Sequence, residues 1–194
     1  MQYKESISPE EMEGLPLAAF EGKIFIIDRV GPEFDEAIRY LKRQRVIGFD
    51  TETRPTFTPH QPRPETALLQ LSGKGKAFLF RINRMGMPRK LCMLLSSEKI
   101  IKVGAAVKDD VRGLQRYAGF KEQAFVDLQQ KVGEYGILDK SVKKMSAIIL
   151  DVRISKAQQL SNWEAETLSE PQALYAATDA WVCREMYMKL IHNG

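Results

Sequence analysis

Short apolar runs alternate with segments of helical periodicity along most of the chain. Apolar or β-prone runs that predict strands cover residues 22–29, 46–50, 65–72, 76–82, 99–106 and 124–128. Apolar residues at helical spacing predict helices over residues 32–44, 88–97 and 109–119, and helices dominate from residue 128 onward. Strands that alternate with helices in this way predict an α/β fold with a mixed sheet.

Two of the predicted strands, residues 65–72 and 76–82, flank the turn Gly73-Lys74-Gly75. Glycines between two β-prone runs are typical of hairpins, so we expect these strands to pair directly. The same glycines do not predict a phosphate-binding loop, because the GxxxxGK(S/T) spacing is absent.

The predicted strand that begins at Val46 continues as VIGFDTET, so an apolar run ends in Asp50 and Glu52. Residues two apart on a strand point to the same face of the sheet, which lets the two carboxylates converge. Two interpretations remain open at this point. The acids lie at a solvated strand end, or they bind a cation that offsets their mutual repulsion.

Two further features place acids on predicted helices. Asp110 stands at the start of the helix over 109–119, directly after a strand, where open α/β sheets build their sites. An aspartate in a first helical turn also serves as a simple cap. Tyr175 and Asp179 are four residues apart in the helix over 169–190 and share one of its faces. A packed tyrosine beside a solvated aspartate would give the same pattern.

The four acids Asp50, Glu52, Asp110 and Asp179 mean more together than singly. Hard oxygen ligands suit Mg²⁺ or Mn²⁺, and two such ions about 3.5–4 Å apart hold the attacking and leaving oxygens of a phosphodiester. The set therefore predicts a site for two divalent ions, which would neutralise the acids that are costly to bury.

Composition narrows the possible chemistry further. Only His60 and His192 are available as imidazoles, and Cys92 and Cys183 belong to no metal-binding motif, so we expect reduced thiols packed in helices and catalysis by acids. A formal charge of +4 permits a nucleic-acid partner without requiring one.

The length of 194 residues and the 44% hydrophobic content fit one domain. We expect an N-terminal extension over residues 1–21 and a single domain over residues 22–194. The polar, acidic start and the lack of a long apolar run predict a soluble, cytoplasmic protein with no membrane partner.

Three motifs resemble those of a known family. The segments FDTET, KVGAAVKDDVRGLQ and LYAATDAW look like motifs I, II and III of the DEDDy 3′-5′ exonucleases. The resemblance extends from about Gly22 to Ile191 and includes features of the subgroup that contains the Werner syndrome exonuclease domain and its stand-alone bacterial relatives. It implies a ribonuclease H-like fold, with a five-stranded mixed sheet flanked by helices on both faces.

The resemblance also implies roles for the site residues. Asp50 would bridge two ions, Glu52 and Asp179 would complete the shell of the first, and Asp110 would support the second. Tyr175 would orient the attacking water. The implied reaction is hydrolysis of the terminal phosphodiester at a 3′ end, with release of nucleoside 5′-monophosphates. This interpretation requires the acids to lie within reach of one another, in a pocket that no ammonium group blocks.

The resemblance favours DNA over RNA as the substrate and a helicase as a possible partner in trans; it leaves the oligomeric state open. A ribonuclease D-like exoribonuclease and a non-catalytic nucleic-acid-binding scaffold are the alternatives. Basic and aromatic side chains that we expect to contact the substrate are Phe57, Lys143, Lys144, Lys156 and Trp163, although Trp163 equally suits a packing role.

Overall fold

A six-stranded mixed sheet forms the centre of the protein in the computed structural model, which describes residues 2–55 and 64–193. Its strands lie in the order β2-β5-β4-β3-β6-β7. The β3-β4 and β4-β5 pairs are antiparallel, and the other neighbours are parallel. The strands are β2 (Lys23–Ile27), β3 (Val46–Thr53), β4 (Thr66–Ser72), β5 (Lys76–Arg81), β6 (Ile101–Gly104) and β7 (Phe125–Asp127).

This arrangement confirms the α/β class and the hairpin predicted around Gly73-Lys74-Gly75, since β4 pairs directly with β5. It corrects the number of strands, because the family resemblance implied five and the described part of the chain supplies six. The additional strand is β2, which pairs with the outer edge of β5 from Lys23↔Lys76 to Ile27↔Phe80. The apolar pattern over residues 22–29 had indicated this strand.

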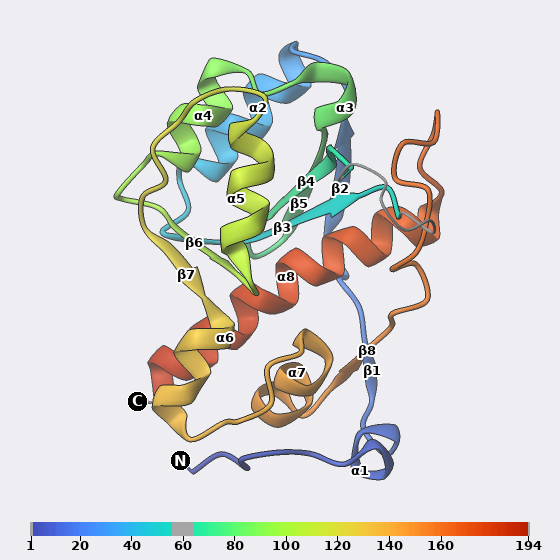
Figure 1. Ribbon diagram of the computed structural model, residues 1–194, viewed down its shortest axis with the longest axis vertical. Coiled ribbons are helices and arrows are strands. Elements are labelled where there is room, and N and C mark those ends of the chain that lie inside the picture. Colours follow the sequence, from blue (N-terminus) through green and yellow to red (C-terminus); the bar gives the residue numbers. More distant parts are fainter. Residues whose placement is uncertain (1, 56–63, 194) are drawn as a thin grey trace.

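Helices cover both faces of the sheet (Figure 1). One face packs against α2 (Pro32–Leu41), α4 (Arg89–Leu95) and α5 (Val107–Gln115), and the other against the long helix α8 (Glu170–Asn193). Helix α7 (Val142–Leu150) packs on α8 from the side away from the sheet, as Figure 1 shows. The site residues on β3 therefore face either α8 or α5.

Shorter elements complete the fold. These are α1 (Pro9–Glu13), β1 (Leu17–Ala18), α3 (Ile82–Met85), α6 (Leu128–Lys131), a 3₁₀ turn over Val132–Tyr135 and β8 (Arg153–Ile154). Strand β1 pairs in parallel with β8. Ile7 and Met12 are buried among residues of α7 and α8, so the N-terminal segment packs against the rest of the molecule.

A close approach of backbones fixes α8 on the sheet. A Cβ atom added to Gly48 of β3 would stand 1.7 Å from the carbonyl oxygen of Ala180. Small buried residues of α8, among them Ala176, Ala177 and Ala180, let the helix come this near. The position of every α8 side chain relative to β3 is consequently set by contact between main chains.

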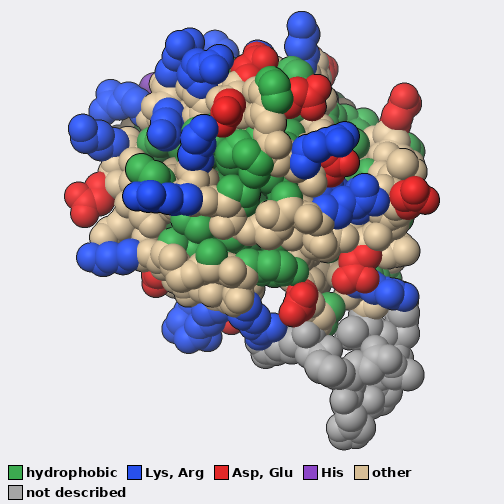
Figure 2. All heavy atoms as spheres, turned by 90° about the horizontal axis from the view of Figure 1, so that it is seen from above, with side chains coloured by type: hydrophobic (Ala, Val, Ile, Leu, Met, Phe, Trp, Pro, Cys, Tyr) green, Lys and Arg blue, Asp and Glu red, His purple; other side chains and the backbone are tan. Residues whose placement is uncertain are grey.

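The surface shows no single basic patch on the face seen in Figure 2, where Lys and Arg side chains alternate with acidic and apolar ones. Among the described residues, no helix has both the length and the apolar character needed to cross a bilayer. Cys92 on α4 and Cys183 on α8 are both free thiols, as expected.

Candidate active site

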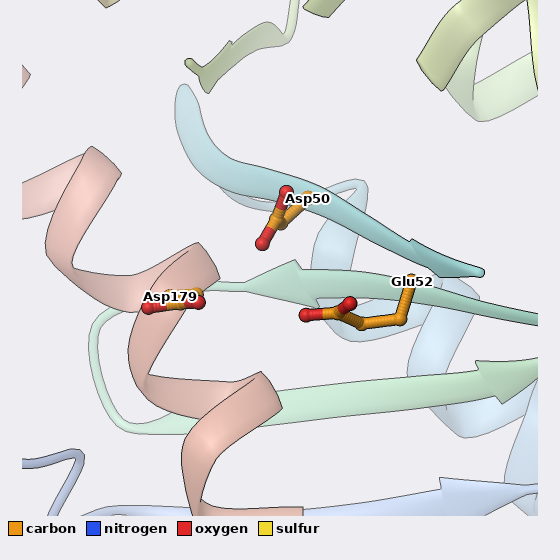
Figure 3. A group of neighbouring side chains, drawn as sticks. All are labelled: Asp50, Glu52 and Asp179. Carbon is orange, nitrogen blue, oxygen red and sulfur yellow. The ribbon is translucent and has the colours of Figure 1, made fainter. Parts of the chain in front are cut away.

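Three carboxylates converge where α8 packs against β3. Asp50 and Glu52 project from β3 toward the same side, and Asp179 projects from α8 to meet them (Figure 3). One oxygen from each carboxylate lies within 4.8 Å of the others. Alternation along a strand explains the first two residues, and the docking of α8 at Gly48 explains the third. The sequence prediction that these acids share one site is consistent with this geometry.

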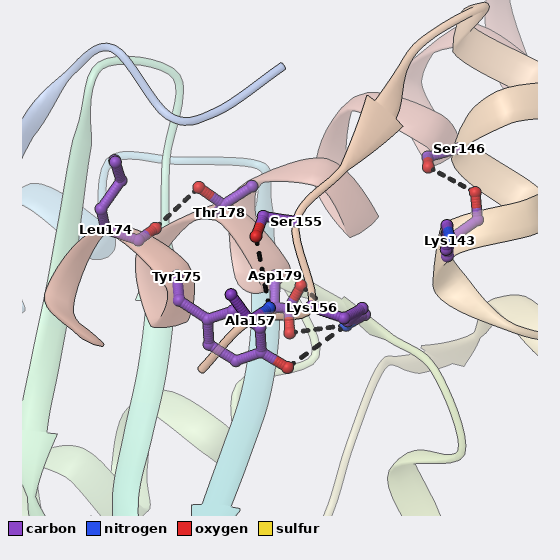
Figure 4. A network of polar contacts seen from close by, with 9 residues as sticks. All are labelled: Lys143, Ser146, Ser155, Lys156, Ala157, Leu174, Tyr175, Thr178 and Asp179. Carbon is purple, nitrogen blue, oxygen red and sulfur yellow. Dashed lines mark hydrogen bonds and ion pairs between the residues drawn. The ribbon is translucent and has the colours of Figure 1, made fainter. Parts of the chain in front are cut away.

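Two hydrogen bonds hold the turn of α8 that carries Asp179. The Thr178 hydroxyl donates to the Leu174 carbonyl at 2.7 Å within the helix, as Figure 4 shows. The same oxygen accepts a bond at 3.0 Å from the backbone N–H of Phe20, before β2. The helix is thus tied to the N-terminal segment at the residue next to the catalytic candidate.

Asp110 lies in the first turn of α5, outside the group of three. Its carboxylate accepts a hydrogen bond of 2.5 Å from the Thr51 hydroxyl. Thr51 stands between Asp50 and Glu52, so it points to the other face of β3, where α5 packs. The cap role that the sequence left open is not seen, because α5 begins at Val107 and its N-cap residue is Ala106, with no side-chain cap.

Thr51 is the residue that the sequence analysis missed. The alternation that sends Asp50 and Glu52 toward α8 was sufficient to predict that Thr51 faces α5. Its hydroxyl links β3, which carries Asp50 and Glu52, to Asp110 on α5.

Burying these acids in their ionised form costs free energy when no metal ion is bound. Burial, then the charges of Asp179 and Asp110, raise the pKa of Asp50 well above its usual range. Burial and the neighbouring Asp50 raise the pKa of Glu52 to about 10. Burial raises the pKa of Asp110 to about 6, even though the Thr51 hydroxyl acts in the opposite direction. A cation at this place would remove much of that cost.

Lys156 supplies one positive charge to the site. Its ammonium group lies 2.9 and 3.1 Å from the two oxygens of Asp179 and 3.4 Å from the Tyr175 hydroxyl (Figure 4). Burial raises the pKa of Asp179, and this ammonium group opposes the effect. The interpretation required that no ammonium group block the acidic site, and Lys156 lies at its Asp179 side. Among the residues that the structure describes, Lys156 forms an ion pair with Asp179 and none with Asp50 or Glu52.

Tyr175 and Trp163 form an aromatic pair at the edge of the site. Their ring centroids are 5.8 Å apart, and Trp163 is fully buried. A buried ring that already packs on Tyr175 has no free face for a nucleobase, so its placement favours the packing role over base stacking. Arg81 supports the same segment, since its guanidinium donates to the Ala165 carbonyl at 2.5 Å.

The remaining substrate-contact candidates lie elsewhere. Lys143 and Lys144 are on α7, where Lys144 forms an ion pair of 2.8 Å with Asp139. Figure 4 shows Lys143 on a different element from Tyr175 and Asp179, away from them. Phe57 lies outside the described residues. Of the four candidates that the structure describes, Lys156 is the one that contacts the acidic group.

The donor set fits a hard divalent ion. Carboxylate oxygens are the ligands that Mg²⁺ and Mn²⁺ prefer, and Asp50, Glu52 and Asp179 bring three carboxylates together from two elements. The raised pKa values of the acids and the position of the Lys156 ammonium group both indicate a place where positive charge is stabilised. The mixed sheet and the buried carboxylate group together are those of a nuclease domain with a ribonuclease H-like fold.

Comparison with known proteins identifies the family. A family model described as 3′-5′ exonuclease matches residues 31–193. Exonuclease 3′-5′ domain-containing protein 2 of Drosophila melanogaster is 36% identical over 82% of this chain, and the mouse bifunctional 3′-5′ exonuclease/ATP-dependent helicase WRN is 35% identical over 77%. This chain therefore belongs to the 3′-5′ exonuclease family.

The chain spans 27% of the length of the Drosophila relative and 11% of the mouse one. Ribonuclease D of Gluconacetobacter diazotrophicus is 28% identical over 80% of this chain and 39% of its own length. The EXO domain of Aedes aegypti Nibbler superposes with a TM-score of 0.78 at 20% identity, over 91% of this chain and 94% of that one. This last similarity confirms the fold.

Proposed function

We propose that the protein is a metal-dependent 3′-5′ exonuclease that removes nucleoside 5′-monophosphates from DNA ends, with two divalent ions in its site. The observation that carries this proposal is the convergence of Asp50, Glu52 and Asp179 from β3 and α8. Family membership supports the reaction, and the acids supply the ligands that it needs.

The acids have distinct places in this proposal. Asp50 would serve both ions, Glu52 and Asp179 would hold the first, and Asp110 would support the second from α5. A bound divalent ion supplies positive charge that stabilises the negative charge on the phosphate in the transition state. The protein residues hold this charge at the end of β3 and position the 3′ end against it.

Tyr175 orients the attacking water in this proposal. Burial, together with the charge of Asp179, raises the pKa of its hydroxyl well above the usual value, so the phenol stays protonated. A protonated phenol both donates and accepts a hydrogen bond, which suits the placement of a water molecule. The ring is held for this task by Trp163.

Lys156 would be available to contact the substrate phosphate when divalent ions neutralise Asp179. Its side chain is partly exposed, and its ammonium group lies beside both Tyr175 and Asp179. A flexible cation at this position is suited to a phosphate oxygen near the scissile bond.

The test is degradation of a 5′-labelled oligonucleotide. We expect a ladder of shortened products from single-stranded or recessed-end DNA with Mg²⁺ or Mn²⁺, and none with EDTA. Asp50→Asn removes a ligand charge and should lower the rate at least about 10³-fold, in the range that metal-site chemistry supplies. Asp109→Asn is the matched control, because that exposed acid pairs with Arg112 and is not one of the three converging carboxylates.

Full-length substrate under every combination of metal and strand type would contradict the proposal, as would wild-type cleavage by Asp50→Asn. Metal-independent binding without cleavage would support the scaffold alternative instead.

RNA is the second candidate substrate. The similarity to ribonuclease D of Gluconacetobacter diazotrophicus favours it. Matched DNA and RNA oligonucleotides of one sequence distinguish the two, and faster loss of the RNA would reassign the substrate while leaving the site unchanged.

A further inference from the structure

A buried amide lies beside the acids without a hydrogen-bond partner. Gln70 is near the middle of β4 and has no exposed surface. Neither its Oε1 nor its Nε2 bonds to any of the residues that the structure describes. A buried amide of this kind has given up its hydrogen bonds to water, and most such groups in folded proteins are paired.

The register of the sheet places Gln70 directly opposite Asp50 on the neighbouring antiparallel strand. Opposite residues on such strands project to the same face, with Cβ atoms about 4.5–5.5 Å apart. This face is the one that α8 covers, because Gly48, two residues before Asp50, contacts the α8 backbone. The amide of Gln70 is therefore within a side chain's reach of the Asp50 carboxylate.

The other side chains next to Gln70 on the sheet are less suitable hydrogen-bond partners for its amide. On the opposite side of β4, Gln70 pairs with Leu79 of β5. On its own strand and face, Leu68 is apolar and the Ser72 hydroxyl already donates to Gly73. Asp50 lies beside Gln70, and its carboxylate has acceptor capacity left beyond the hydrogen bond that it accepts from the backbone of Thr51.

We propose that Gln70 is a positioning residue of the metal site, whose amide N–H donates to the Asp50 carboxylate when that carboxylate holds divalent ions. This inference rests on the proposed function. A carboxylate shared by two ions must present both oxygens in fixed directions, and a buried donor behind it restricts its rotation. Hydrogen bonds to ligating carboxylates commonly have this effect on metal affinity. The polar atoms of Gln70 then gain their partner in the loaded site.

The substitution Gln70→Leu separates this role from a purely structural one. Leucine removes the unpaired polar atoms, so the metal-free variant in EDTA should resist urea at least as well as wild type. Its Mn²⁺ affinity, measured by isothermal titration calorimetry, should fall about 10- to 100-fold. The exonuclease rate should fall at low Mn²⁺ and recover when the Mn²⁺ concentration is raised.

Two further variants make the result decisive. Gln70→Met keeps an unbranched side chain of similar length and repeats the measurement if leucine packs poorly. Ser72→Ala is the matched control on the same face of β4, opposite Gly48, and should leave Mn²⁺ affinity unchanged. If Gln70→Leu and Gln70→Met bind Mn²⁺ as wild type does, while Asp50→Asn loses binding, the role of Gln70 is refuted and the metal site stands. If wild type itself binds no Mn²⁺, the proposed function fails together with it.

Discussion

The positive charge of Lys156 partly neutralises the buried carboxylate of Asp179. Its ammonium group bonds to both oxygens of Asp179, whose side chain is 6% exposed. In EDTA, Lys156→Met should lower the free energy of unfolding by about 1–3 kcal/mol, because it leaves a buried acid without its partner. Saturating Mn²⁺ should reduce that difference, since the ion then neutralises Asp179.

Chemical denaturation in EDTA and in Mn²⁺ measures both values. Lys144→Met is the control, because it breaks the ion pair between Lys144 of α7 and Asp139, which precedes that helix, and should have the same effect in either buffer. An equal loss of stability for Lys156→Met in the two buffers would show that Lys156 does not substitute for a metal ion.

The Tyr175 hydroxyl is a second test at the level of single residues. The hydroxyl lies 3.4 Å from the Lys156 ammonium group and also hydrogen-bonds to Asp179, so Tyr175→Phe should lower the free energy of unfolding by about 0.5–1.5 kcal/mol. The rate should fall about 10²-fold if the hydroxyl orients the attacking water, because positioned acid–base groups commonly contribute a rate factor of that size. Tyr40→Phe, a hydroxyl beside the β4-β5 hairpin, should leave the rate unchanged. An unaltered rate for Tyr175→Phe would remove the hydroxyl from the mechanism.

At the scale of elements, the contact between β3 and α8 decides whether the site assembles. A Cβ atom at residue 48 would collide with the main chain of Ala180, and a backbone cannot rotate out of the way as a side chain can. Gly48→Ala should therefore cost about 1–3 kcal/mol or more of stability and displace Asp179 and Tyr175. Activity should drop even at temperatures where the variant remains folded.

Urea denaturation and the exonuclease assay together test this prediction. Gly119→Ala serves as the control, since a Cβ atom there meets no heavy atom within 4 Å. Wild-type activity in Gly48→Ala would mean that α8 tolerates a shift without moving its side chains.

The elements themselves were largely predictable from the sequence. Periodicity predicted the strands from β2 to β7 and the helices α2, α4, α5 and α8, because each buries one or both faces. The two-residue strand β8 was not predicted, since a pair of residues carries no period. The same period placed Asp50 and Glu52 on one face.

Contacts between side chains far apart in the sequence were harder to predict from the sequence. The convergence of Asp179 with Asp50 entered through family resemblance, because residue spacing does not determine how α8 docks. The contact of Lys156 with Asp179 and the complete burial of Trp163 depend on the course of the segment before α8, which has no periodic pattern. An amphipathic ring such as Trp163 suits either a core or a binding surface, so its sequence context left both open.

At the scale of the whole molecule, the acids make the metal-free protein sensitive to pH. The folded-state pKa values of these acids are raised. Between pH about 4 and about 6, the folded state therefore holds a proton on Asp110 that the unfolded chain has released. The same is true of Glu52 up to pH about 10. The free energy of unfolding in EDTA should consequently decrease as pH rises through this range.

Urea denaturation in EDTA between pH 5 and 8 measures the slope, and Asp50→Asn should make it shallower because one repelling charge is gone. Added Mg²⁺ should also flatten the slope, since metal binding favours the ionised carboxylates. Stability that rises with pH in EDTA would contradict the raised pKa values.

The distance along the chain between β3 and α8 has a consequence for biosynthesis. A nascent polypeptide that has left the ribosome only as far as α7 carries Asp50 and Glu52 but lacks Asp179 and Tyr175. Such an intermediate lacks part of the carboxylate group on which the proposed cleavage depends. The group is complete only after α8 has been synthesised and has docked on β3.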